Sequence, residues 1–158
     1  MVSALSSSTI DGHEHFPAPD KGAAFFEGIL EIDPVPCPRP RVTRAGVTYY
    51  PKRYTDFKKA IGLMLKQQWM SREPLDFFYL SAEFYFAYPK SYPKRQQQEA
   101  APMRNRCDLD NLVKGLMDAM QDAGMIQDDR QLSAIDLSKH WTTGTSRIHF
   151  YLEAVDAQ

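Results

Sequence analysis

The sequence has few cysteines and no long hydrophobic run, and both shortages exclude classes of protein. Cys37 and Cys107 are its two cysteines in 158 residues, which are too few and too far apart for a zinc knuckle or a disulfide framework. We expect both to be reduced thiols in a cytoplasmic protein. No apolar stretch is long enough for a membrane span, no signal peptide pattern opens the chain, and no internal repeat is present. A single domain of ordinary size, long enough for a real core, is therefore expected.

Residues 1–22 also lack an apolar periodic run, so we predict a disordered tail there and a folded domain over residues 23–158. Beyond the tail, the pattern predicts strands over 25–32 and 47–50, a helix over 54–70 and an aromatic-rich strand over 75–88. A second helix and two strands, over 132–141 and 147–154, complete the order, the last two being predicted to form a hairpin. This order indicates an α+β fold in which two helices cover one face of a small mixed sheet.

The net charge of −1 hides a strong segregation of charge along the chain. Residues 34–106 contain 14 Lys and Arg against 5 Asp and Glu, whereas the segments before and after them are both acidic. A basic half beside an acidic cluster suits an enzyme that acts on phosphodiesters, because cations hold the backbone while acids hold a metal. The alternative is that these cations are scattered residues that keep the protein soluble.

Two segments rich in proline carry most of the positive charge. The first, over 36–54, is interleaved with tyrosines that can stack on unpaired bases. The second, over 88–106, is polar and leads into the acidic motif, so we predict a mobile loop that substrate orders. Arginine and lysine side chains on such loops can bind phosphate oxygens. The predicted nucleic-acid contacts are Arg39, Arg41, Arg44, Lys52, Arg53, Lys90, Lys94, Arg95, Arg104 and Arg106.

The most informative segment is CDLDNLVKGLMDAMQDAGMIQDDRQL, which begins at Cys107. Its apolar residues recur at three- and four-residue spacing, which predicts an amphipathic helix. Asp108 and Asp110 lie where this helix begins, Lys114 follows one turn later, and Asp128 and Asp129 come after the helix. Two carboxylates about 4 Å apart repel by roughly 4 kcal/mol at a surface-like dielectric, so a bound Mg²⁺ or Mn²⁺ is the expected reason for gathering them.

Each part of this motif also has an ordinary interpretation. Asp108 can be a helix cap, Asp110 and Lys114 an exposed i, i+4 salt bridge, and the Asp128–Asp129 pair a plain turn. Taken together they favour an acidic metal site, provided that the second pair of aspartates returns to the first in space. Cys107 adjoins the motif, but Mg²⁺ prefers oxygen ligands.

The motif resembles that of the RusA-type Holliday-junction resolvases, which are Mg²⁺-dependent endonucleases. The resemblance lies in Asp108-Leu109-Asp110-Asn111-Leu112, Lys114, Asp118-Ala119, Ala123-Gly124 and Asp128-Asp129, and extends more loosely over residues 24–155. It implies that Asp108, Asp110 and Asp129 bind the metal and that Lys114 serves the chemistry, with Asp128 and Asn111 at further family positions. The N-terminal extension and the middle loop depart from the family.

The resemblance further implies a homodimer of a bacterial or phage protein that resolves four-way DNA junctions by paired symmetric nicks, in recombination and repair. Two other functions stay open on the sequence: a different metal-dependent nuclease, acting on flaps or other branched DNA, and a non-catalytic module that binds DNA junctions. Intact aspartates and Lys114 argue against the second, because a binding module gains little from carboxylates placed near phosphate.

Overall fold

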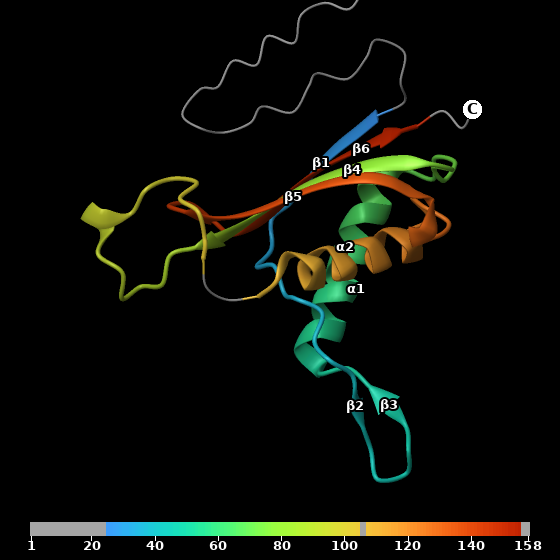
Figure 1. Ribbon diagram of the computed structural model, residues 1–158, viewed down its shortest axis with the longest axis horizontal. Helices are drawn as coiled ribbons and strands as arrows, with labels where there is room; N and C mark the ends of the chain where they lie inside the picture. Colours follow the sequence, from blue (N-terminus) through green and yellow to red (C-terminus); the bar gives the residue numbers. More distant parts are fainter. Residues whose placement is uncertain (1–24, 105–106, 156–158) are drawn as a thin grey trace, which may run out of the picture.

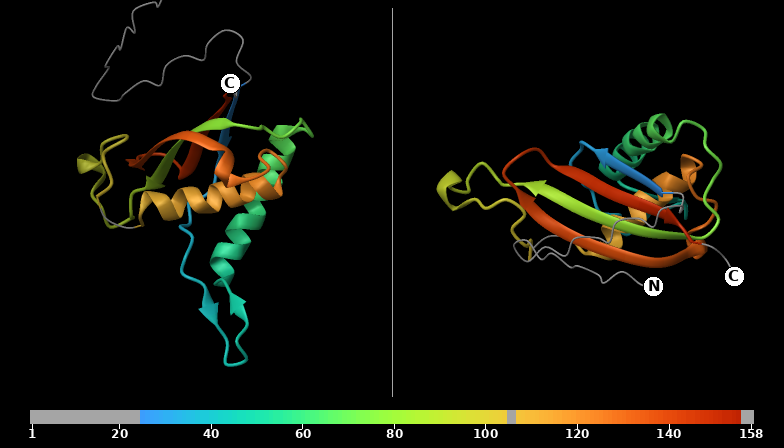
Figure 2. Two further views of the ribbon diagram at one scale, coloured as in Figure 1. Left: turned by 45° about the vertical axis from the view of Figure 1, so that its right-hand side comes forward. Right: turned by 90° about the horizontal axis from the view of Figure 1, so that it is seen from above.

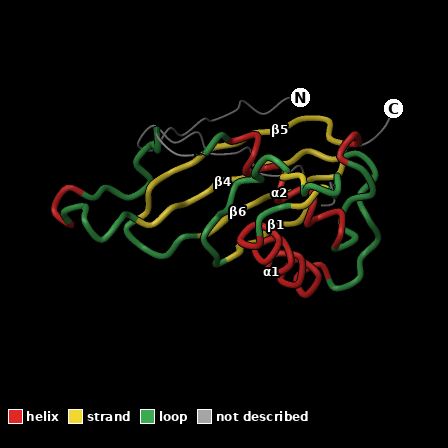
Figure 3. Tube along the Cα trace, turned by 90° about the horizontal axis from the view of Figure 1, so that it is seen from below, coloured by secondary structure: helices red, strands yellow, loops and turns green. Residues whose placement is uncertain are grey.

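The computed structural model describes residues 25–104 and 107–155. Its main sheet has four strands in the order β1-β6-β4-β5, and the helices α1 (Lys52–Trp69) and α2 (Leu109–Asp122) lie against one face of it (Figures 1 and 3). The strands are β1 (Phe25–Leu30), β4 (Phe78–Ala87), β5 (Leu132–Thr142) and β6 (Arg147–Ala154). The predicted α+β architecture, with two main helices on one face of a mixed sheet, is confirmed.

The core lies between the helices and the sheet, and the apolar periodicity of the sequence explains why. Alternate residues of β6, among them Ile148, Phe150 and Leu152, are buried, whereas their neighbours are partly exposed on the opposite face. The buried face of α1 includes Phe57 and Ile61, and the buried face of α2 follows the same helical spacing. Helix and strand patterns read from the sequence therefore converge on one hydrophobic core.

Strand β4 occupies the centre of the sheet and explains a wrong prediction. It pairs antiparallel with β6 on one side and parallel with β5 on the other, so β5 and β6 are separated by β4 and do not form the predicted hairpin. The connection from β5 to β6 passes the end of β4, where the Ser146 hydroxyl accepts a hydrogen bond from the Ala87 amide (2.9 Å). A ten-residue strand with three buried aromatic or aliphatic side chains gains by having a partner on both edges.

A narrow hairpin projects from the molecule beyond the start of α1 (Figures 1 and 2). Its strands β2 (Arg41–Val42) and β3 (Thr48–Tyr49) pair antiparallel, and its turn includes Gly46 at a φ of 82°, a conformation that favours glycine. The sequence predicted an extended loop followed by a short strand here, so β2 is an addition. All residues from Pro40 to Tyr50 are exposed, which leaves the hairpin free to reach a partner.

A second projection, the arm formed by residues 88–104, leaves the far end of β4 (Figure 1). The sequence predicted a mobile loop, whereas this arm contains the short 3-10 helix η1 (Lys94–Gln96) and returns along β5. The amide of Trp141 donates to Ala101 (2.8 Å), and Pro102 forms a bridge with His140. The arm is therefore attached to the sheet on its return path.

The predicted disordered tail, residues 1–22, lies outside the described residues, as does Arg106. Within residues 25–104 and 107–155, no helix combines the length and the apolar character needed to cross a membrane.

Candidate nuclease site

A cavity of about 920 Å³ lies at the N-terminal end of α2 and contains the first half of the acidic motif. Three parts of the chain meet there: the proline-rich segment 36–40, the first turn of α2, and Lys139 of β5. The Cys37 amide donates to the Asn111 carbonyl oxygen (2.9 Å), and Lys139 Nζ donates to the Cys107 carbonyl oxygen (2.8 Å). The lining residues are Pro36, Cys37, Pro38, Arg39, Pro40, Tyr50, Arg104, Cys107, Asp108, Asp110, Asn111, Lys114 and Lys139.

Asp108 occupies the N-cap position of α2, as the sequence allowed, but its side chain makes no capping hydrogen bond. An aspartate at this position ordinarily accepts a bond from a backbone amide of the first turn. Because that bond is not made, the carboxylate is exposed and lines the cavity beside Asp110, which lies in the first turn of the helix. The positive end of the helix dipole stabilises both negative charges at this end.

Lys114 also lines the cavity, and its ion-pair partner differs from the one expected. Its Nζ lies 3.5 Å from Oδ2 of Asp118, one turn further along α2, rather than pairing with Asp110. The Asp118 carboxylate is the main cause of a raised pKa for Lys114, and partial burial opposes it. Lys114 therefore keeps its proton at neutral pH and presents a positive charge to the cavity.

Tyr54 of α1 supports α2 directly behind this lysine. The side chain is buried, and a Cβ atom added at Gly115 would lie only 3.2 Å from Cε2 of Tyr54. Glycine at position 115 thus allows the two helices to approach closely at the residue that follows Lys114. Burial is the first cause of a raised pKa for Tyr54, with the Cys37 thiol adding to it, so the phenol stays neutral.

Asp128 and Asp129 do not reach this cavity. They lie at the start of η2 (Asp129–Gln131), which follows the C-terminal end of α2, and a helix of 14 residues spans roughly 21 Å. Within residues 25–104 and 107–155, no three Asp, Glu, His or Cys side chains are grouped closely enough to hold a metal ion. The predicted return of this pair to Asp108 and Asp110 is therefore wrong for a single chain, because the connection after α2 is too short to reverse the helix's length before β5 begins.

Asp128 has a local structural role instead. Its carboxylate accepts from the Arg130 amide (2.9 Å) and from the Arg130 guanidinium (2.8 Å), and its own amide donates to the Gln131 side chain (3.1 Å). The side-chain hydrogen bond from Arg130 is the first cause of a lowered pKa for Asp128. This capping box holds the turn that leads from α2 into β5. Asp129 itself is exposed.

The cations predicted to contact nucleic acid surround the cavity in two groups. Arg39 and Arg104 line it. The first group continues onto the hairpin and the start of α1, where Lys52 pairs with Asp56 (2.5 Å). The second group lies on the arm. The predicted contacts outside the cavity are Arg41, Arg44, Lys52 and Arg53 in the first group, and Lys90, Lys94 and Arg95 in the second; all are exposed.

Several lining residues were not predicted as site residues from the sequence. Asp118 could have been found, since it lies four residues from Lys114 on the same helix face. Lys139 was considered only as an extension of a DNA-contacting surface, and Cys37 only as a buried thiol. Neither carries a local signal, because each reaches the cavity through the packing of its segment on α2 or β5.

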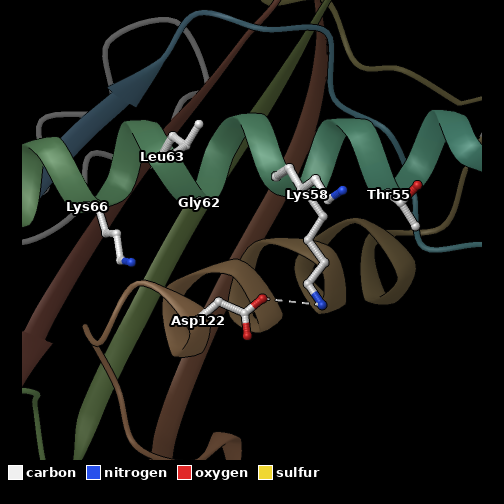
Figure 4. A pocket seen from close by; sticks show the side chains of 7 residues that line it. Thr55, Lys58, Gly62, Leu63, Lys66 and Asp122 are labelled. Carbon is white, nitrogen blue, oxygen red and sulfur yellow. Dashed lines mark ion pairs between the residues drawn. The ribbon is translucent and has the colours of Figure 1, made fainter.

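A second cavity, of about 510 Å³, lies between α1 and the C-terminal end of α2 (Figure 4). Its only ion pair among the residues drawn joins Lys58 Nζ and Asp122 Oδ2 (3.4 Å). The lining residues are Thr55, Lys58, Lys59, Gly62, Leu63, Lys66 and Asp122. With a single carboxylate, already paired, it offers no comparable set of catalytic groups.

The comparisons with known proteins agree with the geometry. The family model described as endodeoxyribonuclease RusA matches residues 31–152. The comparison with curated proteins gave no match. A solved structure titled "Crystal structure of HypE-HypF complex" aligns with a TM-score of 0.31 and 15% identity, over 85% of this chain and 34% of that one. This chain thus spans about a third of that structure's chain, and the likeness is too weak to carry an argument. The match over residues 31–152 includes the whole cavity at the start of α2, and the chain belongs to the RusA family of endodeoxyribonucleases.

Proposed function

We propose that this protein is a structure-specific endodeoxyribonuclease that cleaves four-way DNA junctions by metal-dependent hydrolysis. One observation carries the proposal: Asp108, Asp110 and Lys114 line one open cavity, with Arg39 and Arg104 also lining it, in a chain of the RusA family. Carboxylates for a cation, a protonated lysine and flanking arginines are the groups that hydrolysis of a phosphodiester requires.

The donor atoms of the cavity fit a hard divalent cation. Asp108 and Asp110 offer carboxylate oxygens and Asn111 a side-chain amide oxygen, the ligand types that Mg²⁺ and Mn²⁺ prefer. Mg²⁺ is commonly held by one or two carboxylates together with water and substrate phosphates, so two aspartates are sufficient. When bound, the ion polarises the scissile phosphate and lowers the pKa of a bound water. Asp129 lies outside this cavity, so in one chain the proposed ligands are Asp108 and Asp110.

The role that we propose for Lys114 is stabilisation of negative charge rather than removal of a proton. Its raised pKa, caused chiefly by Asp118, favours the ammonium form, and a protonated amine cannot act as a general base. From its place in the cavity wall the ammonium group can bind a phosphate oxygen and oppose the charge that develops on it during attack. Asp118 is the residue that positions and charges Lys114.

The hairpin and the arm provide the proposed grip on DNA. Arg39 and Arg104 lie in the cavity wall, and the exposed cations of the two projections extend outward from it. Phosphate contacts of this kind supply affinity without reading sequence. A four-way junction has two-fold symmetry, so a C₂ dimer would present two such cavities and make paired nicks.

One assay tests the reaction and its substrate. Labelled four-way junction, flap and linear duplex are each incubated with the protein, once with Mg²⁺ and once with EDTA. We expect paired symmetric nicks in the junction with Mg²⁺ alone. Cleavage of the flap in preference to the junction would replace the proposed substrate, and binding of the junction without cleavage under every metal condition would indicate a non-catalytic module.

Asp110→Asn and Lys114→Gln serve as variants that separate the two roles, with Lys66→Gln as a matched control on the outer face of α1. Loss of cleavage in both site variants and normal cleavage in Lys66→Gln would support the assignment of the cavity. Equal activity in all three proteins would remove the cavity from the reaction.

A further inference from the structure

Three aromatic rings stack face to face where the arm joins the sheet. The rings of Tyr88 and Trp141 have centroids 5.2 Å apart and planes 13° apart, and those of Tyr88 and Tyr92 are 5.0 Å and 20° apart. Tyr88 is thus the middle ring, and Tyr92 is the outer ring, with 41% of its surface exposed. Offset or parallel stacks of this spacing are favourable between aromatic side chains, and they are equally favourable between a side chain and a nucleobase.

The rings are fixed before any partner arrives. The Glu99 carboxylate accepts hydrogen bonds from the Thr142 hydroxyl (2.9 Å) and from the Thr143 amide (2.8 Å) and hydroxyl (2.6 Å), which fasten the arm to the end of β5. The Tyr88 hydroxyl donates to the Gln98 carbonyl oxygen (2.7 Å). None of these bonds involves the Tyr92 ring, so attachment of the arm does not explain why that ring extends the stack. A preordered ring costs little entropy when it binds a ligand.

The surroundings of the outer ring are cationic. Residues 88–104 contain Lys90, Lys94, Arg95 and Arg104 against one acid, Glu99, which is occupied by Thr142 and Thr143. Lys90, Lys94 and Arg95 are exposed on either side of Tyr92 in the chain. A ligand that presents a flat apolar face together with negative charge satisfies both features, and a nucleotide with an unstacked base has this chemistry.

The stack also lies close to the cavity. Trp141 and Lys139 are two residues apart on β5 and so point to the same face, about 7 Å apart along the strand. Lys139 lines the cavity. With two ring-to-ring steps added, Tyr92 lies on the order of 20 Å or less from the cavity wall, about six steps of a stacked DNA strand at 3.4 Å each.

We propose that Tyr92, supported by Tyr88 and Trp141, is a stacking platform for an unpaired base of the branched DNA, a few nucleotides from the scissile phosphate. This inference rests on the proposed function for the identity of the nucleic acid. It adds a source of structure selectivity, because a base inside an intact duplex has no free face to offer. The projection that holds the platform also brings its cations to the adjoining phosphates.

The test compares Tyr92→Ala, Tyr92→Leu and Tyr92→Phe with the wild type, in EDTA to prevent cleavage. Phe25→Ala is the matched control, since Phe25 is an exposed ring that stacks on Tyr151 (5.8 Å) at the opposite end of the sheet. The probes are oligo-dT, a blunt duplex, and a four-way junction with 2-aminopurine at the branch point. Affinity and quenching of 2-aminopurine fluorescence are measured, and thermal unfolding checks that each variant is folded.

We expect Tyr92→Ala and Tyr92→Leu to lose about tenfold in affinity for oligo-dT and for the junction, with weaker quenching, because base–aromatic stacking contributes roughly one order of magnitude or more. Affinity for the blunt duplex stays within about twofold. Tyr92→Phe and Phe25→Ala behave as the wild type. Unchanged affinity and quenching in Tyr92→Ala would overturn the platform, and so would an equal loss on duplex and junction.

The two proposals fail separately in this design. If the wild type cleaves junctions and Tyr92→Ala binds them normally, the platform is wrong and the nuclease stands. If the wild type cleaves no junction yet Tyr92→Ala loses affinity for oligo-dT, the platform stands and the proposed substrate is wrong.

Discussion

The close approach of α1 and α2 behind Lys114 can be measured with two glycine substitutions. Gly115→Ala places a Cβ 3.2 Å from Cε2 and 3.4 Å from the hydroxyl oxygen of Tyr54. Tyr54 is 2% exposed, so it has little room to move. Gly62→Ala makes the same change within α1, where a Cβ meets nothing within 4 Å. The two substitutions therefore share the change in helix propensity and differ in packing.

The expected magnitudes follow from these two terms. Alanine is more favourable than glycine in a helix interior by about 0.8–1 kcal/mol, so Gly62→Ala should raise the free energy of unfolding by about that amount. Overpacking of a close helix contact costs typically about 1–3 kcal/mol. Gly115→Ala should thus range from neutral to destabilising by about 2 kcal/mol, and the two variants should differ by about 1–3 kcal/mol.

Urea denaturation gives both values, since a shift of the midpoint at constant slope reports a change in stability alone. In thermal unfolding the difference corresponds to several degrees, at roughly 2–4 °C for each kcal/mol in a domain of this size. Equal stabilisation by Gly62→Ala and Gly115→Ala would refute the reasoning, because it would mean that Tyr54 does not press on α2 at this point.

Three further predictions concern the site and the open face of the sheet. Asp110→Asn should abolish junction cleavage while binding is kept or strengthened, because one negative charge near phosphate is removed; binding lost together with cleavage would contradict this. Arg39→Ala should lower the salt dependence of DNA binding by nearly one unit of slope per lost phosphate contact, and an unchanged slope would exclude Arg39 from the interface. His149 lies between Glu83 and Glu27, which raise its pKa, whereas the pKa of Glu83 is lowered chiefly by His149. The stabilisation is therefore complete between the ordinary pKa values of 4.5 and 6.5, is lost as pH rises through the raised pKa of His149, and is lost again as pH falls through the lowered pKa of Glu83. Urea midpoints of His149→Gln and the wild type should accordingly differ more at about pH 6 than at about pH 9, and a difference independent of pH would contradict the ion pairing.

The open face of the sheet helps to explain why stability and activity can be varied independently. His149 Nε2 lies 2.5 Å from Glu27 Oε1, and Tyr85 donates to Glu83 (2.6 Å), on the face opposite the helices. The cavity is lined by the proline-rich segment, the start of α2 and Lys139. Changes to this ionic network should therefore alter the free energy of unfolding without touching the groups proposed for hydrolysis.

Local patterns in the sequence determined the helices, most strands and the chemistry at the start of α2. The three- and four-residue spacing of apolar side chains predicted α2, and the order of residues along it fixed that Asp108, Asp110 and Lys114 share one end of one helix. These relations hold because a helix sets the positions of its residues within a few turns. Alternation in β6 similarly predicted which side chains reach the core.

Tertiary structure decided every relation between distant segments. It inserted β4 between β5 and β6, kept Asp129 at the far end of α2, and brought Lys139 and Arg39 to the cavity. It also stacked Trp141 on Tyr88, 53 positions earlier in the chain. Pairing of strands and packing of loops depend on how the whole core is filled, and no local repeat of side chains encodes them.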